Sequence, residues 1–352
     1  SIKKYLHITT IMSSSTTVFV SGASGFIAQT LVKQLIEKGY KVVGTVRSNE
    51  KGDSLKENLK AAKLQSENFT YEIVKDIAVK GAFDDALKKH PEVTVFLHTA
   101  SPFHFNVTDI EKELLTPAVE GTNNALQAIK THGPQIKRVV VTSSYAAVGR
   151  FADLADPSIP ATEESWNPIT WEQSLSNPLA GYVGSKKFAE KAAWDFVEKE
   201  KPNFTLSVIN PVYVFGPQAF EIKNKSQLNT SSEIINGLLN SKPDSKFDNL
   251  TGYFIDVRDV AKAHIVAFEK DSIQGQRLIL AESPFSTQSI LDLIRKDFPQ
   301  LDSQLPKGDP SQADAWKKAE SKIENEKTRE LLGFKFIDFK KSIDDSVAQI
   351  IG

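Results

Sequence analysis

The sequence has no cysteine, so disulfide bonds, thiolate nucleophiles and cysteine-based metal sites are all excluded. Its six histidines show neither H-x₃-H nor HExxH spacing, and we therefore expect no metal site. The sequence also has no large excess of charge of either sign, because 43 Lys and Arg residues and 44 Asp and Glu residues give a net charge of −1. No strong field therefore attracts nucleic acid or an anionic membrane. No apolar run approaches the ~20 residues that a membrane-spanning helix needs.

What the 352 residues do contain is a regular alternation of β-branched runs and amphipathic helical patterns. Strands that alternate with helices at this spacing predict a doubly wound parallel α/β sheet covered by helices on both faces. From residue 212 the elements become shorter, which predicts a smaller C-terminal α/β lobe, and residues 307–320 are interpreted as a charged surface loop or linker. The strands of the large sheet are expected near residues 16–22, 40–46, 69–74, 93–100, 136–144 and 204–211.

Residues 1–15 carry two lysines and no acidic residue, a mild likeness to a targeting peptide. The segment lacks arginine, however, and is very short. We interpret it as a disordered leader and expect a cytoplasmic protein.

The first expected strand runs into the turn VSGASGFIAQT, which places Gly22, Gly25 and Ala28 in G-x-x-G-x-x-A spacing. Gly22 permits a tight turn, Gly25 lets the backbone approach a pyrophosphate, and Ala28 lets the following helix pack close to the sheet. An ordinary strand-to-helix turn also uses glycine, but this spacing after a first strand favours a dinucleotide-binding Rossmann fold. The predicted cofactor contacts of this turn are Gly22, Ala23, Ser24, Gly25, Phe26 and Ile27.

The second strand ends in GTVRSNEK, and this end distinguishes between cofactors. NAD-selective folds usually have Asp or Glu here to bind the ribose 2′-hydroxyl, whereas this sequence has Arg47 and Lys51. A guanidinium and an ammonium suit a 2′-phosphate, so NADPH is predicted over NADH; a merely solvated Arg47 is the alternative. Further contacts with adenine, ribose and phosphates are predicted after the third and fourth strands, at Asp76, Ile77, Thr99, Ala100 and Ser101.

Two Tyr-x-x-x-Lys pairs occur: Tyr71 with Lys75, and Tyr182 with Lys186. The first pair lies in an expected strand, where positions i and i+4 are about 13 Å apart. The second lies in a helix predicted over residues 182–200, where Cβ atoms at that spacing are only ~6 Å apart. Only the second pair can therefore act as a unit, with the Lys186 cation lowering the pKa of Tyr182.

Ser144 follows the fifth expected strand, at the edge where ligands of open parallel sheets bind. A hydroxyl-rich turn is the plain alternative at this position. Together with the glycine turn and the helical pair, Ser144 instead favours a reductase site, in which it holds a carbonyl oxygen while Tyr182 donates a proton and NADPH a hydride. The predicted catalytic residues are Ser144, Tyr182 and Lys186, and the last two are also expected to bind the cofactor.

In this order, GASGFIA, TVRS, HTASP, TSS, YVGSK, NPVYVFGP and FIDVRDVAKAH resemble the extended short-chain dehydrogenase/reductases, from about Val18 to the C-terminus. TSSYAAV, EESWNP, GSKKFAEKAAW and NPVYVFGPQ are similar to its dihydroflavonol-reductase-like branch, above all to the NADPH-dependent methylglyoxal and carbonyl reductases of yeasts. The resemblance implies reduction of small aldehydes, α-dicarbonyls and ketones. It adds Pro211, Val212 and Ser231 to the NADPH contacts, and it implies substrate contacts at Phe103, Ser144, Tyr145, Tyr182 and Tyr213.

We therefore predict an NADP-binding Rossmann domain over residues 16–211 and a mainly substrate-binding lobe over 212–352, some segments of which return to the Rossmann core. Asp256 and Asp259 are interpreted as capping and loop-anchoring residues. Two rival functions stay open: an NAD-dependent sugar-nucleotide epimerase or dehydratase that uses the same three residues, and a non-catalytic NADP(H)-binding sensor. The predicted partner is a small carbonyl compound, and the chain is expected to be a monomer or a homodimer.

Overall fold

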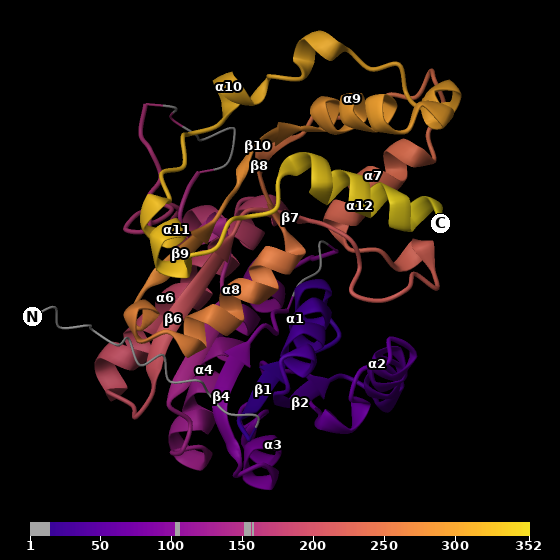
Figure 1. Ribbon diagram of the computed structural model, residues 1–352. Helices are drawn as coiled ribbons and strands as arrows, with labels where there is room; N and C mark the ends of the chain where they lie inside the picture. Colours follow the sequence, from indigo (N-terminus) through magenta and orange to yellow (C-terminus); the bar gives the residue numbers. More distant parts are fainter. Residues whose placement is uncertain (1–14, 103–105, 151–155, 157) are drawn as a thin grey trace, which may run out of the picture.

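The computed structural model describes residues 15–102, 106–150, 156 and 158–352 (Figure 1). Most of the expected leader and the predicted substrate contact Phe103 lie outside these ranges. None of the helices in the described part combines the length and apolar character that crossing a membrane requires. Nor do three acidic or histidine side chains of these residues gather closely enough to hold a metal ion.

The larger sheet has seven parallel strands in the order β3-β2-β1-β4-β5-β6-β9. The chain proceeds from β1 toward one edge, returns, and then proceeds from β4 toward the other edge, so the strand order reverses between β1 and β4. Ligands of open sheets bind at such a reversal, beyond the carboxyl ends of the strands. This topology confirms the predicted doubly wound α/β sheet. Its strands are β1 Thr17–Ser21, β2 Lys41–Val46, β3 Phe69–Ile73, β4 Val93–His98, β5 Arg138–Thr142, β6 Thr205–Pro211 and β9 Arg277–Leu280.

Helices cover both faces of this sheet, because successive residues of a strand point to opposite sides. One apolar cluster joins Val18 and Val20 of β1 to α1 (Phe26–Glu37) and α8 (Val257–Glu269). The opposite face, marked by Phe19, packs against α4 (Thr116–His132) and α6 (Pro178–Glu200). The remaining α-helices are α2 Asn49–Ala61, α3 Asp84–Lys89, α5 Trp171–Ser174, α7 Thr230–Leu239, α9 Thr287–Asp297, α10 Trp316–Ala319, α11 Glu326–Leu332 and α12 Phe339–Ile351.

A smaller mixed sheet forms the core of the C-terminal lobe, in the order β10-β8-β7. Its strands β7 (Tyr213–Phe215) and β8 (Thr251–Asp256) are parallel, and β10 (Ser283–Ser286) is antiparallel to β8. Figure 1 shows α7, α9 and α12 gathered around this sheet. The segment 307–320 is largely exposed, as expected, but it is not a free linker, because Thr251 and Ser286 both donate hydrogen bonds to it.

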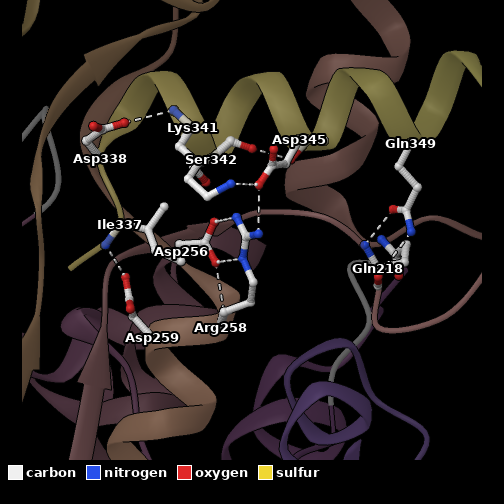
Figure 2. Close-up of polar contacts among 11 residues, drawn as sticks. Gln218, Asp256, Arg258, Asp259, Ile337, Asp338, Lys341, Ser342, Asp345 and Gln349 are labelled. Atoms are coloured by element: carbon white, nitrogen blue, oxygen red, sulfur yellow. Dashed lines mark hydrogen bonds and ion pairs between the residues drawn. The ribbon is translucent and has the colours of Figure 1, made fainter. Parts of the chain in front are cut away.

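A polar cluster that we call the C-terminal clamp attaches α12 to the start of α8 (Figure 2). Asp256 caps α8 by accepting from the backbone N–H of Arg258 at 2.8 Å, and the Arg258 side chain returns to both Asp256 oxygens at 2.8 Å. Arg258 also donates to Asp345 of α12 at 2.7 Å. Asp259 accepts from the backbone N–H of Ile337 at 2.7 Å. The predicted capping and anchoring functions of Asp256 and Asp259 are thus confirmed.

Candidate active site

The turn between β1 and α1 has the geometry of a phosphate cradle. Gly22 adopts φ +65°, and a Cβ there would lie 2.8 Å from the Ala100 Cα, so only glycine fits. Gly25 has an ordinary φ of −69°, and a Cβ there would make only an ordinary contact, 3.5 Å from the Gly22 carbonyl oxygen. The protein itself does not require glycine at this second position, which is consistent with the close approach of a ligand. Because α1 begins without a side-chain cap, its first N–H groups suit a pyrophosphate.

The neighbouring rim of the sheet is held by hydrogen bonds from β4 to β1. Thr99 donates its hydroxyl to the carbonyl of Ser21, and the backbone N–H of Ala100 donates to Ser21 Oγ at 3.1 Å. His98 Nδ1 lies 2.8 Å from the same Ser21 Oγ. The structure therefore places Thr99 and Ala100 beside the glycine turn, at the strand-order reversal.

Arg47 and Lys51 are exposed at the end of β2 and in the first turn of α2. Ser48 caps this helix by accepting from the Lys51 backbone N–H at 3.3 Å. Among the described residues, no carboxylate lies within ion-pair distance of either cation. Both charges thus remain available to an anionic ligand.

Asp76 and Ile77 lie in the loop after β3. The Asp76 carboxylate is exposed and accepts from the Ala78 backbone N–H at 2.9 Å. Asn124 of α4 donates to the Ile77 carbonyl at 2.9 Å, and a Cβ at Gly121 of α4 would lie 2.6 Å from Ile77 Cδ1. The loop is therefore fixed against α4 by both backbone and side-chain contacts.

The predicted catalytic side chains converge at the carboxyl edge of the sheet. Tyr182 and Lys186 are one turn apart on α6, with the Lys186 Nζ 5.8 Å from the centre of the Tyr182 ring. The Tyr182 and Ser144 side chains share a hydrogen bond, and Lys186 Nζ donates to Ser101 Oγ at 2.8 Å. The other pair differs as expected: Tyr71 lies on strand β3 and donates its hydroxyl to Asp53 at 2.6 Å.

Burial dominates the protonation of these groups. Burial raises the pKa of Tyr182, while its hydrogen bond with Ser144 lowers the pKa by less. Desolvation of the phenolate thus outweighs the hydrogen bond in this structure, and the lowering of the Tyr182 pKa by the Lys186 cation stays a prediction. Burial lowers the pKa of Lys186 to about 8, and burial together with the Lys186 charge lowers the pKa of His98 to about 4.

Aromatic side chains flank this group on the side of the C-terminal lobe. Tyr145 lies in a short 3₁₀ turn directly after Ser144, and its hydroxyl packs so closely on Gly149 that a Cβ there would be 2.2 Å away. Tyr213 of β7 packs edge-to-face on Phe285 at 5.4 Å. Burial raises the pKa of Tyr213 to about 12, and the charges of Glu320 and Tyr182 add to this. Tyr213 thus lies within electrostatic range of Tyr182.

The other predicted cofactor contacts lie where the two sheets meet. Pro211 ends β6, and the Val212 backbone N–H donates to the Leu280 carbonyl at 3.2 Å. Ser231 of α7 donates its hydroxyl to the Val214 carbonyl, so it ties this helix to β7. These residues form a junction between the lobes rather than part of the glycine turn.

Four polar residues beside the site were missed from the sequence: Glu190, Asn210, Arg277 and Glu320. Glu190 follows Lys186 by one helical turn, so its spacing offered a signal. Asn210 is a polar residue that follows Val208 and Ile209 at the carboxyl end of β6, which was a second signal. Glu320 accepts from Thr251 at 2.8 Å, and burial raises the pKa of its carboxyl group.

Comparison with known proteins gives consistent relatives. Residues 18–281 match the family described as the NAD dependent epimerase/dehydratase family. The chain is 48% identical to the NADPH-dependent methylglyoxal reductase GRE2 of Saccharomyces cerevisiae, over 95% of this chain and 98% of that protein. A crystal structure of Gre2 from Candida albicans in complex with NADPH is 52% identical, with a TM-score of 0.90 and coverage of 96% of this chain and 98% of that one. The structure of yeast methylglyoxal/isovaleraldehyde reductase Gre2 with NADPH is 47% identical over 95% and 98% of the two chains, with a TM-score of 0.90.

Proposed function

The chain belongs to the NAD dependent epimerase/dehydratase family, and within it we propose an NADPH-dependent carbonyl reductase. The membership also confirms the resemblance to the extended short-chain dehydrogenase/reductases. The proposed reaction is the reduction of small aldehydes, α-dicarbonyls such as methylglyoxal, and ketones to alcohols. One observation supports it above others: Ser144, Tyr182 and Lys186 meet beside the glycine turn, in a chain that shares about half its residues with NADPH-dependent methylglyoxal reductase.

The residues present fit NADPH. The glycine turn, where a Cβ at Gly25 would make only ordinary contacts, and the uncapped start of α1 suit the pyrophosphate, and Arg47 with Lys51 suits the 2′-phosphate. An NAD-dependent epimerase would be expected to present a carboxylate after β2, where this chain presents two cations. Homologues of known structure hold NADPH. When bound, the cofactor supplies the hydride.

The protein's own groups then divide the remaining tasks. Ser144 donates a hydrogen bond to the substrate carbonyl and orients it. Tyr182 donates the proton, since a phenol is protonated at neutral pH, and the Lys186 cation one turn away stabilises the phenolate that remains after the transfer. Lys186, anchored to Ser101, presents a cation to the ribose hydroxyls. Tyr145 and Tyr213 are proposed as walls of the substrate pocket.

The test is an absorbance assay with the purified protein, NADPH or NADH, and a panel of aldehydes, ketones and α-dicarbonyls. Consumption of NADPH with methylglyoxal, at a kcat/KM at least tenfold above that with NADH, is the expected result. Binding of NADPH without turnover of any carbonyl would instead favour the sensor. Conversion of sugar nucleotides with bound NAD would favour the epimerase.

A second measurement tests the cofactor assignment alone. Replacing Arg47 with Leu and Lys51 with Met removes both cations, and the KM for NADPH should rise about 30-fold because charge-assisted bonds to a phosphate are lost. The KM for NADH should change less than threefold. Lys56→Met on the same helix, also exposed, is the matched control and should alter neither value. Equal effects on both cofactors would refute the 2′-phosphate assignment.

A further inference from the structure

Glu190 is a buried carboxylate on the helix that bears the proposed catalytic pair. It lies one turn beyond Lys186 and two turns beyond Tyr182, and it is 1% exposed. Its Oε1 accepts from Arg277 Nε at 2.6 Å and from Trp194 Nε1 at 3.1 Å. Five side-chain donor atoms converge on its two oxygens.

Two of those donors lead directly to Ser144. The hydroxyl of Ser143, its chain neighbour, donates to Glu190 Oε2 at 2.6 Å. Asn210 of β6 donates to the same oxygen at 2.7 Å and also to the backbone carbonyl of Ser144 at 3.2 Å. The carboxylate therefore holds the main chain on both sides of the Ser144 hydroxyl.

Glu190 also faces the interior side of Lys186. A cavity of about 20 Å³ is lined by both side chains together with Ser101, Thr142 and Ser143, among others. A space of this size accommodates about one water molecule. The carboxylate thus lies directly behind the proposed site and is connected to two of its elements.

Arg277 neutralises the carboxylate without leaving a free charge in the interior. It is 9% exposed, and its Nη1 donates to the carbonyls of Glu163 and Ser165, the former at 3.0 Å. Its guanidinium stacks over the Trp166 ring at 4.0 Å. A buried carboxylate needs such a partner, since an uncompensated charge in the interior is costly.

We propose that Glu190 is a positioning residue of the reductase site, which fixes Ser144 relative to Tyr182 by binding Ser143 and Asn210. The inference rests on the proposed function. Because Glu190 and Tyr182 share one rigid helix, a carboxylate that also holds the Ser144 loop sets the distance between the proton donor and the residue that orients the carbonyl. A misplacement of that kind lowers the rate while the cofactor still binds.

The test is a double-mutant cycle between Glu190→Gln and Ser144→Ala, with kcat, the KM for NADPH and the melting temperature measured for each protein. A glutamine has the same shape, but it presents an NH₂ group to donors that need an acceptor. Glu190→Gln should lower kcat about 10- to 30-fold and change the KM for NADPH less than threefold. Ser144→Ala should lower kcat about 100-fold.

The decisive value is the double variant. If Glu190 acts through Ser144, the kcat of the double variant should lie within about threefold of the kcat of Ser144→Ala alone. If the two losses multiply, Glu190 acts independently of Ser144 and the inference is overturned. A Ser144→Ala protein with full activity would overturn the proposed function of Ser144 itself, which the single variant reports separately.

Two further variants exclude a general loss of folding. Asn210→Ala removes the bridge to Ser144 and leaves the Glu190–Arg277 pair intact, so the same cycle with Ser144→Ala decides the question should Glu190→Gln fail to fold. Asp256→Asn, which also neutralises a fully buried carboxylate paired with arginine, should lower the melting temperature but keep kcat within threefold. An equal loss of kcat in Asp256→Asn would show that any buried ion pair has this effect and would overturn the inference.

Discussion

Two ion pairs in the described part of the chain have a carboxylate side chain with no exposed surface: Glu190–Arg277 and Asp256–Arg258. Among the residues that the structure describes, Asp256 accepts only from the backbone and the side chain of Arg258, and Arg258 also donates to Asp345 on α12. Glu190 accepts from its arginine and also from Ser143 and Asn210. Both lie at the carboxyl edge of the large sheet, beside the proposed catalytic residues, and we call this region the catalytic edge. A buried carboxylate paired with arginine thus attaches α12 in the clamp, whereas we propose that it positions reacting groups at Glu190. The other hydrogen bonds of each carboxylate distinguish the two cases.

The two regions also differ in their balance of charge. The clamp gathers Asp256, Asp259 and Asp345 around Arg258, and burial, aided by the charge of Asp256, raises the pKa of Asp259 to about 7. At the catalytic edge, no carboxylate of the described residues lies within ion-pair distance of Lys186. We therefore expect changes at the catalytic edge to alter turnover, and changes in the clamp to alter stability.

The largest effect is expected for Tyr182→Phe, which removes the hydroxyl proposed as the proton donor, together with its hydrogen bond to Ser144. kcat should fall about 1,000-fold, within the range that general acids contribute. The affinity for NADPH, measured by fluorescence titration, should change less than threefold, and the melting temperature should not fall. If the melting temperature fell together with kcat, Tyr182 would contribute to stability as the clamp residues do, and the proposed difference between the two regions would be contradicted.

The converse change is Arg258→Met in the clamp. It leaves Asp256 buried without its ion-pair partner, which should lower the free energy of unfolding by about 2–4 kcal/mol. kcat should stay within threefold at temperatures where the protein is folded. Lys340→Met is the control, because Lys340 is 62% exposed in its pairs with Asp297 and Asp344, and its loss should cost less than about 1 kcal/mol. Denaturant unfolding of both variants measures the difference.

Much of the large sheet and the centre of the site could be predicted, because both depend on short-range patterns. A stretch of about a dozen residues is enough to predict each of three features: the glycine turn, the cations after β2 and the i,i+4 pair on α6. Hydrogen bonds between residues far apart in the sequence could not be predicted from such patterns. Arg277 lies 87 residues from Glu190, and no periodicity connects the two positions. The same holds for Glu320, the last residue of the charged segment 307–320, which has no apolar periodicity.

The pKa of Tyr182 shows a second limit. The sequence correctly placed a cation one turn away, but the direction of the shift depends on how much water the folded chain excludes from the phenol. That quantity depends on how segments distant in the sequence pack together in the fold. Local spacing therefore predicted which groups meet and not how their protons are held.

A smaller effect is expected for Asp259→Asn, which tests the charge crowding in the clamp. The carboxyl group holds its proton up to about pH 7 in the folded chain but only to about pH 4 when unfolded, so folding takes up a proton between these values. Stability should therefore fall as the pH rises from 4 to 7. Asn keeps an oxygen for the Ile337 N–H, so the variant should lose this slope and be roughly 1–3 kcal/mol more stable than the parent at pH 8. Urea unfolding of both proteins at pH 4, 6 and 8 measures the free energy of unfolding. If this energy changed with pH equally in the variant and the parent, the raised pKa of Asp259 would be contradicted.

The pH dependence of turnover should come from the other region. Burial lowers the pKa of Lys186 to about 8, so its charge is present below that pH and lost above it. kcat/KM for NADPH, which reports the free enzyme, should fall about tenfold per pH unit above 8. Stability should change in the opposite sense, rising between pH 8 and about 10.5, because the unfolded lysine keeps its proton longer. Asp259→Asn should leave the profile of kcat/KM unchanged; if it moves the inflection, the group that controls turnover lies in the clamp, and the division between the two regions fails.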